Sequence, residues 1–369
     1  MTIARECNMR KILIYTMTMI YGGAERVISN LVNYLCQNNQ IILVTNIKTD
    51  SSYKLNSKIK YINIDTKDKS KEFILKKIIT KLSFKRTKEL EKIILKYKPD
   101  VVISFLPEPT MRALSLKRKS LKDIPVVVAV RNDPRFEYNF PFGKLIRNFY
   151  YKRADKFVFQ TKSYLKYFND KIIKNAYIIP NMISDEYLID TYKYKRNKKI
   201  VSVGRLEKQK NYKLLINSFN NLSSKYKDYK LEIYGNGKEF GNIQKYINKL
   251  SLNDRVKIYR GVKDIKSKIY NASLFVLSSK YEGVSNSLIE AMALGIPVIA
   301  TNSSLGIKDL LYNNKIGLLV KNNDATQLTK KMEFALNEEE NKKLSKQSYK
   351  IRDLLNNKEI LEKWENVLK

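Results

Sequence analysis

Residues 281–301 read YEGVSNSLIEAMALGIPVIAT and contain one helix followed by one buried strand. The helix is expected to begin near the capping residue Ser285, to present an apolar stripe with helical spacing, and to end at Gly295. The solidly apolar run from Pro297 to Ala300 is typical of a strand in a parallel sheet. This stretch is therefore one unit of an α/β domain.

Two carboxylates, Glu282 and Glu290, flank the start of this helix. Glu282 lies on the preceding loop and Glu290 about a turn and a half into the helix. Both can face the crevice at the carboxyl ends of the strands, where open α/β sheets bind ligands, and two acids there suit a polyhydroxylated ligand. The alternative is that Glu282 only complements the helix dipole and that Glu290 is a solvated helix residue.

Length and charge limit what the chain can be. Its 369 residues suit two domains of about 150 to 200 residues each. Lys and Arg number 71 against 36 Asp and Glu, giving a formal net charge of +35. Such a charge attracts nucleic acid, an anionic membrane face or phosphorylated substrates. The alternative is that the many lysines reflect a base-composition bias in the source genome.

Cysteine and histidine usage narrows the chemistry. The only cysteines, Cys7 and Cys36, predict neither a disulfide framework nor a cysteine metal site and favour a reducing compartment. Histidine, the commonest general base and metal ligand, is absent from the chain. Because the chain also lacks an Asp-x-Asp pair, we expect neither a metal nor a cofactor.

Strand-like runs alternate with helical ones, which predicts two Rossmann-like, doubly wound α/β domains with a cleft between them. We expect an amino-terminal domain over 1–181, a second domain over 182–351 and a terminal helix over 352–369, with a polar linker between Pro180 and Asn197. The strands are expected at 11–16, 41–45, 60–64, 101–105, 126–130, 156–160, 176–179, 200–203, 230–234, 256–259, 274–277, 297–300 and 317–320. A lysine-rich helical stretch is expected over 69–97.

The block from Glu282 to Ala300 resembles the nucleotide-sugar site of family 4 glycosyltransferases, which are retaining enzymes of the GT-B fold. Upstream, VSVGRL at 201–206 followed by Lys210 is similar to the diphosphate-binding segment of that family. Gly22 and Gly23 resemble its amino-terminal glycine loop. By this resemblance the first domain is acceptor-side, the second binds the nucleotide sugar, and the terminal helix crosses back to the first domain.

The resemblance implies roles for particular residues. Arg205 and Lys210 would neutralise the departing diphosphate, and Glu282 would contact the transferred sugar, so these three form the expected catalytic set. Residues expected to bind the donor are Gly22, Gly23, Gly283, Val284, Ser285, Asn286 and Glu290. Gly235-Asn236-Gly237 is similar to another loop of the family, with a plain turn as the alternative.

One departure of the chain from the family matters for the site. Many members have a histidine in the first domain, whereas here the strand 126–130 runs into Arg131-Asn132-Asp133-Pro134. Arg131 or Asn132 could hold a donor or acceptor phosphate instead, and Glu108 ends another strand of the first domain. The alternative for Asp133-Pro134 is plain turn chemistry.

The sequence therefore favours a retaining, metal-independent glycosyltransferase. It would move a sugar from a nucleotide-diphosphate donor, with uridine favoured, to a surface glycan such as capsule or O-antigen. A polyprenyl-diphosphate-linked acceptor is expected. A nucleotide-sugar epimerase is the nearer alternative. A basic nucleic-acid-binding protein is the more distant one, and nucleic acid is not expected as a partner.

An acceptor of that kind lies at the cytoplasmic face of the cell membrane, and no apolar run approaches the roughly 20 residues of a membrane span. We therefore expect peripheral docking on an anionic membrane surface. The expected patch is 69–98 with 112–122, where basic residues alternate with Phe73, Ile74, Leu75, Phe84, Leu114 and Leu116. The alternative is a merely solvated lysine-rich face.

Overall fold

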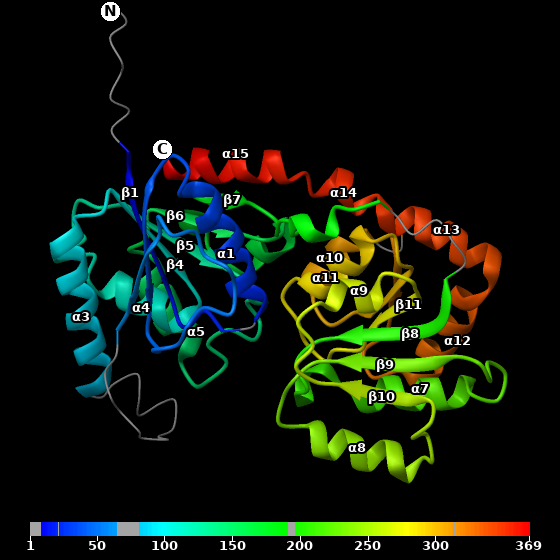
Figure 1. Ribbon diagram of the computed structural model, residues 1–369. Coiled ribbons are helices and arrows are strands. Elements are labelled where there is room, and N and C mark those ends of the chain that lie inside the picture. The colour runs from blue at the N-terminus through cyan, green and yellow to red at the C-terminus, as the bar shows by residue number, and fades with distance from the viewer. Residues whose placement is uncertain (1–8, 21, 65–80, 191–195, 313–314) are drawn as a thin grey trace, which may run out of the picture. The chain divides into compact units, whose positions relative to one another are not determined.

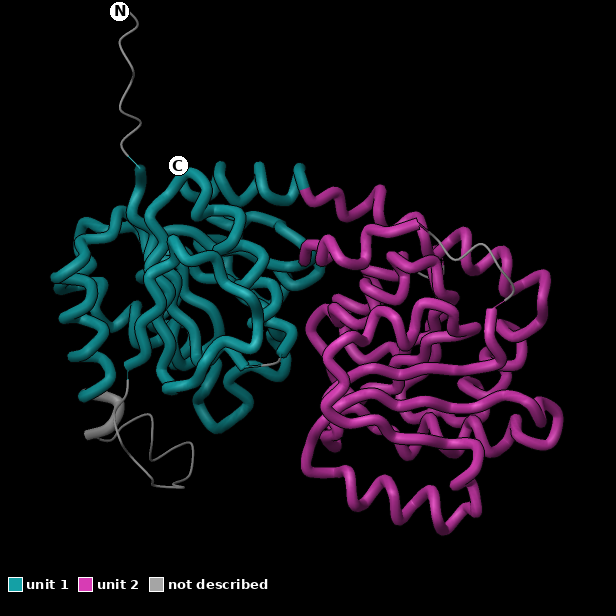
Figure 2. The backbone as a smooth tube through the Cα atoms, in the orientation of Figure 1, with its two compact units in different colours: residues 1–180, 358–369 teal, residues 181–357 magenta. Residues whose placement is uncertain are grey.

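The computed structural model describes residues 9–20, 22–64, 81–190, 196–312 and 315–369. The chain divides into two compact units, which Figure 2 draws in different colours. The first unit consists of residues 1–180 and 358–369, and the second of residues 181–357.

In its described part the first unit contains a seven-stranded parallel sheet with the order β3-β2-β1-β4-β5-β6-β7 (Figure 1). Every residue of β4 and β5 is buried, because helices cover both faces of the sheet. The strands are β1 Lys11–Thr16, β2 Gln40–Thr45, β3 Lys60–Asn63, β4 Val101–Phe105, β5 Val126–Val130, β6 Lys156–Phe159 and β7 Ala176–Ile178. The helices are α1 Gly23–Leu35, α3 Lys81–Tyr97, α4 Pro107–Ser115, α5 Gly143–Tyr151, α6 Asp170–Lys174 and α15 Asn357–Leu368.

The second unit contains, over its described residues, a six-stranded parallel sheet with the order β10-β9-β8-β11-β12-β13. Its strands are β8 Asn197–Val203, β9 Lys230–Tyr234, β10 Val256–Tyr259, β11 Ala272–Leu277, β12 Val298–Thr301 and β13 Leu318–Val320. Its helices are α7 Tyr212–Leu222, α8 Phe240–Lys249, α9 Ile265–Ile269, α10 Asn286–Ala293, α11 Leu305–Leu310, α12 Ala325–Leu336, α13 Glu338–Tyr349 and α14 Ile351–Leu354.

The predicted strands are confirmed in position, with ends that differ by up to three residues. The largest difference is at β8, which begins at Asn197 where Ile200 was predicted. The preceding connector is also less exposed than its polar sequence predicts. Ile183 and Tyr187 are each 1% exposed, and Arg352 donates a hydrogen bond of 3.0 Å to the Tyr187 carbonyl. The second unit therefore begins before β8, with residues that pack against its last helices.

The terminal helix α15 packs into the first unit through its aromatic side chain. Trp364 is fully buried, with its ring centroid 6.2 Å from that of Phe105 on β4. Lys156 on β6 donates a hydrogen bond of 2.7 Å to the Val367 carbonyl. Residues separated by some 200 positions in sequence are thus joined, and α15 is an integral part of the first unit.

Candidate active site

The candidate site lies where the connections of the second sheet change direction. The strands β8 and β11 are neighbours, but β9 lies on one side of them and β12 on the other. The chain therefore leaves β8 and β11 in opposite directions at their carboxyl ends, which opens the crevice where such sheets bind ligands. The segments that begin here are 204–211 after β8 and 278–285 after β11.

An ion pair joins these two segments. The Lys210 ammonium lies 2.5 Å from Glu282 Oε1, and the two side chains are only 11% and 10% exposed. The hydroxyl of Ser279 donates a second hydrogen bond, of 2.6 Å, to the same carboxylate oxygen. Two of the three residues expected to be catalytic are therefore in direct contact.

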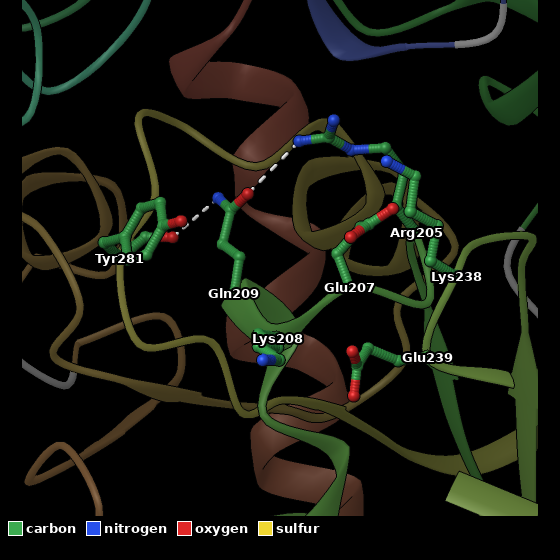
Figure 3. Close-up of a pocket in the computed structure, with 7 residues that line it drawn as sticks. All are labelled: Arg205, Glu207, Lys208, Gln209, Lys238, Glu239 and Tyr281. Atoms are coloured by element: carbon green, nitrogen blue, oxygen red, sulfur yellow. Dashed lines mark hydrogen bonds between the residues drawn. The ribbon is translucent and has the colours of Figure 1, made fainter. Parts of the chain in front are cut away.

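Arg205 is connected to the same junction through Gln209. The Arg205 guanidinium donates to the Gln209 side-chain oxygen at 3.1 Å, and the Gln209 amide donates to the Tyr281 carbonyl at 2.8 Å (Figure 3). The backbone N–H of Lys280 also donates to the Gln209 carbonyl, at 2.8 Å. Arg205 itself is exposed, so its charge is held at the junction but is accessible to a ligand.

Three glycines allow close backbone packing next to Arg205 and Lys210. A Cβ on Gly204 would lie 2.8 Å from the Lys210 Cε atom, so a larger residue would displace that lysine. A Cβ on Gly235 would lie 1.9 Å from the Gly204 carbonyl oxygen, and one on Gly237 would lie 2.3 Å from the Leu206 carbonyl oxygen. The Gly235-Asn236-Gly237 loop therefore supports the backbone on either side of Arg205 from behind.

A hollow of about 480 Å³ opens beside Arg205, a size typical of small-molecule sites (Figure 3). It is lined by Arg205, Glu207, Lys208, Gln209, Lys238, Glu239 and Tyr281. Gln209 and Lys238 were not among the predicted site residues. The available signal for Gln209 was its position between Arg205 and Lys210. Lys238 directly follows the Gly235–Gly237 loop.

Helix α10 brings the expected donor-binding residues to the same edge. The Ser287 hydroxyl donates to the Val203 carbonyl at 3.0 Å, which holds the start of the helix against the end of β8. The Ser285 hydroxyl lies 3.1 Å from that of Ser287 and makes no capping bond to the described backbone. Ser304 donates to the Gly283 carbonyl at 2.8 Å. Val284 and Asn286, beside them, are partly exposed.

Glu290 lies within α10 and is 5% exposed. A solvated helix residue, the alternative considered from the sequence, would have an exposed carboxylate, so that alternative is wrong. Burying a carboxylate costs free energy unless the carboxylate has hydrogen-bond or charge partners. Buried ionisable side chains of this kind are common at functional sites.

The two glycines of the amino-terminal loop belong to the first unit. Gly22 follows β1 and immediately precedes α1, which begins at Gly23. A Cβ on Gly22 would lie 2.1 Å from Glu25 Oε2, so the Glu25 carboxylate occupies the space that a side chain would need. The Tyr53 hydroxyl donates a hydrogen bond of 2.8 Å to the Gly22 carbonyl. Tyr53 and Glu25 therefore hold Gly22 in place at the start of α1.

The residues after β4 and β5 have different surroundings. Glu108, in the first turn of α4, pairs with Arg112 at 2.5 Å and with Arg86 at 3.4 Å. Asn132 is exposed. Arg131, expected as a phosphate ligand, is 5% exposed, with its guanidinium 5.5 Å from the Phe105 ring centre and 5.4 Å from that of Trp364.

This environment gives Arg131 a packing role, and its contact with a phosphate stays a prediction. Burial lowers its pKa to about 9, so its surroundings stabilise the charged form less than water does. A guanidinium enclosed by aromatic rings contributes packing and cation–π attraction between β4 and α15. Asp133, paired with Arg135 at 2.7 Å, also accepts from the Arg135 backbone N–H at 2.9 Å, which is the turn chemistry considered as its alternative.

Glu137, on the same loop, was not identified from the sequence. It is 5% exposed, and its Oε2 atom has no hydrogen-bond partner among the described residues. Burial raises its pKa to about 8, with the Arg147 charge and an Asn132 hydrogen bond acting in the opposite direction. The carboxyl group is therefore protonated in the folded protein over a pH range in which it would ionise in the unfolded chain.

We expect Glu137→Gln to flatten the dependence of stability on pH. Between the ordinary pKa of 4.5 and about 8 the folded state binds the extra proton, so this group makes stability fall as pH rises. The variant should match the wild type near pH 5 and be more stable near pH 9. Urea unfolding at both pH values measures the free energy of unfolding of the variant and of the wild type. If the two proteins differ by the same amount at pH 5 and at pH 9, the raised pKa of Glu137 is contradicted.

Three further observations concern metals and membranes. Among the described residues, no group of three or more Cys, Asp or Glu gathers as metal ligands would. No helix in the described ranges is long and apolar enough to cross a membrane. The predicted membrane patch needs correction because Leu114 is fully buried and Leu116 is 3% exposed. Phe73, Ile74, Leu75 and the side chain of Phe84 lie outside the described residues.

Family models match both halves of the chain. The model described as Glycosyl transferases group 1 matches residues 184–362, and that described as Glycosyltransferase Family 4 matches residues 21–187. An uncharacterized glycosyltransferase of Methanocaldococcus jannaschii is 31% identical over 272 residues, which are 64% of this chain and 67% of the relative.

Two further comparisons cover nearly the whole chain. The Campylobacter jejuni protein named GalNAc-alpha-(1->4)-GalNAc-alpha-(1->3)-diNAcBac-PP-undecaprenol alpha-1,4-N-acetyl-D-galactosaminyltransferase is 26% identical over 336 residues, 90% of each chain. The crystal structure of Anabaena HepE in complex with UDP aligns with a TM-score of 0.76 at 13% identity, covering 98% of this chain and 99% of that one. This structural likeness shows the GT-B fold.

Proposed function

Because the chain belongs to the group 1 and family 4 glycosyltransferases, we propose that it is a retaining, metal-independent enzyme that transfers a sugar from a UDP-sugar to a surface glycan. In this proposal the second unit binds the donor and the first unit binds the acceptor. The observation that carries the proposal is the junction at the β8 and β11 carboxyl ends, where Arg205, Lys210 and Glu282 converge.

The junction suits a leaving nucleotide diphosphate. Arg205 has a planar fork of donors that matches phosphate oxygens and is exposed beside the hollow. Lys210 is fixed by its ion pair with Glu282, so it needs no reorganisation when charge develops on the diphosphate. Fixed cations of this kind supply the stabilisation that a divalent metal provides in other transferases.

Glu282 is assigned the role of orienting the transferred sugar and holding Lys210 in position. Its Oε1 atom already accepts hydrogen bonds from Lys210 and Ser279, which engage its lone pairs and make it a weaker nucleophile. We therefore favour front-face transfer. The bond from the anomeric carbon to the diphosphate oxygen breaks, the acceptor oxygen bonds to the same face, and the departing diphosphate oxygen takes the acceptor proton.

The remaining assignments follow the placement of the side chains. Glu290 is proposed to bind the ribose hydroxyls, and residues 283–286 at the start of α10 are proposed to face the sugar and the distal phosphate. Gly22, Gly23, Glu108, Arg131 and Asn132 of the first unit stay proposals for donor or acceptor contact. The name of the Campylobacter relative specifies an undecaprenol-linked acceptor, which supports a polyprenyl-diphosphate-linked glycan here.

A nucleotide-sugar panel tests the proposal. The donor should raise the melting temperature, because a ligand at 100 times its Kd adds about 2.7 kcal/mol to the free energy of unfolding. Transfer to a lipid-linked acceptor should continue in EDTA and should release nucleotide only when acceptor is present. Nucleotide sugars interconverted without acceptor would identify an epimerase instead. Transfer abolished by EDTA and restored by magnesium would disprove metal independence.

A further inference from the structure

Helix α5 of the first unit presents apolar side chains to solvent. Phe142 immediately precedes the helix, and Leu145 and Phe149 follow at intervals of three and four residues, so all three lie on one helical face. Their exposed fractions are 76%, 66% and 57%. Among the described large apolar residues, only Leu95 at 58% reaches similar exposure. The three most exposed apolar residues outside α3 are thus concentrated on a single face.

The stripe is exposed because α5 packs against the first unit through its opposite side. The residues that α5 buries against the unit are Gly143, Arg147 and Tyr151, the last two at 3% and 2% exposed. The Arg147 guanidinium lies 4.5 Å from the Phe168 ring centre and donates to the Tyr167 carbonyl at 3.1 Å. The inward side of α5 thus contains Arg147 beside Tyr151, while its apolar stripe faces solvent, which is unusual for a surface helix.

Basic residues border the stripe. Residues 138–154 contain four Lys or Arg and no Asp or Glu. Lys144 and Lys152 are exposed, and the Arg153 guanidinium lies 4.6 Å from the Phe149 ring centre. We call Phe142, Lys144, Leu145, Phe149, Lys152 and Arg153 the α5 surface. Apolar side chains beside uncompensated cations are typical of a helix that lies in the interface of an anionic bilayer.

We propose that the α5 surface docks the protein on an anionic lipid bilayer, with Phe142, Leu145 and Phe149 inserted among the acyl chains near the headgroups. Lys144, Lys152 and Arg153 would then contact the lipid phosphates. A second copy of this chain is a poorer occupant, since pairing two such surfaces would bring like charges together. The purpose of docking rests on the proposed lipid-linked acceptor, but the binding itself does not.

Vesicle co-sedimentation of the full chain tests the proposal. Wild-type protein should bind vesicles of phosphatidylglycerol and phosphatidylcholine at low salt, bind phosphatidylcholine alone weakly, and dissociate as salt rises. The triple variant Phe142→Ser/Leu145→Ser/Phe149→Ser should bind the anionic vesicles at least about ten-fold more weakly, because its inserted area is lost. The matched control is Leu95→Ser, which removes an equally exposed apolar side chain from lysine-rich α3 and should bind like the wild type.

The outcomes distinguish a loss of lipid binding from a loss of folding or of donor binding. Unchanged melting temperature and unchanged donor-induced thermal shift in the triple variant would show that folding and donor binding are intact. Wild-type binding by the triple variant, or loss of binding in Leu95→Ser alone, would overturn the α5 assignment. Self-association that the triple variant abolishes, without vesicle binding by the wild type, would identify a protein interface and overturn the lipid proposal. None of these results depends on transfer activity.

Discussion

Lys210→Met is expected to lower kcat by a factor on the order of 10² to 10³, the range seen when one group that stabilises the transition state is removed. It should also lower the free energy of unfolding by about 3 kcal/mol, because Glu282 is left as an uncompensated charge with a side chain only 10% exposed. Steady-state transfer and urea unfolding measure the two losses separately.

The double variant Lys210→Met/Glu282→Gln distinguishes the two contributions. Neutralising both partners removes the unpaired buried charge, so stability should recover much of its loss. Activity should stay low because no cation replaces Lys210 at the leaving group. Recovery of activity together with stability would mean that the ion pair only holds the β8 and β11 segments in place.

Arg205→Ala should lower kcat by a similar factor, on the order of 10² to 10³, without a comparable loss of stability. The physical reason is that Arg205 is exposed and its hydrogen bond, to Gln209 at 3.1 Å, is a surface bond. Arg205→Lys should recover only part of the rate, since a lysine lacks the planar fork.

Lys257→Ala is the matched control for Arg205→Ala. Lys257 is an exposed cation on β10 of the same unit, so its removal changes the net charge equally and away from the junction. Its activity should equal that of the wild type. A similar loss in both variants would assign the effect to the overall field of this basic protein instead of to Arg205.

The local sequence predicted the positions of the strands well. Continuous apolar runs such as 101–105 and 126–130 predicted buried parallel strands, because a strand covered on both faces needs apolar residues at every position. The candidate site was also predictable where it follows strand ends. Arg205, Lys210 and Glu282 come directly after β8 and β11, and the strand order brings these ends together.

Contacts between distant parts of the chain were not predictable from the sequence. The Arg131 guanidinium lies against Trp364 on α15, more than 200 residues away in sequence, and the local sequence does not indicate this contact. Leu116 was expected on a membrane surface and is buried. No local pattern carries such information, because it depends on which element packs against the residue.

The α5 surface is the opposite case, in which residues with the pattern of a buried stripe are exposed. Phe142, Leu145 and Phe149 have the spacing of an ordinary core stripe, and periodicity alone identifies a shared face without showing whether that face is covered. Only the structure shows that α5 packs through Arg147 and Tyr151 and leaves the stripe exposed.

The central claim is that a nucleotide sugar binds at the carboxyl ends of β8 and β11 in the second unit. A crystal structure of the protein with UDP tests it most directly. We predict the diphosphate against Arg205 and Lys210 and the ribose against Glu290. UDP bound elsewhere, with Arg205, Lys210 and Glu290 making no contact to it, would contradict the account.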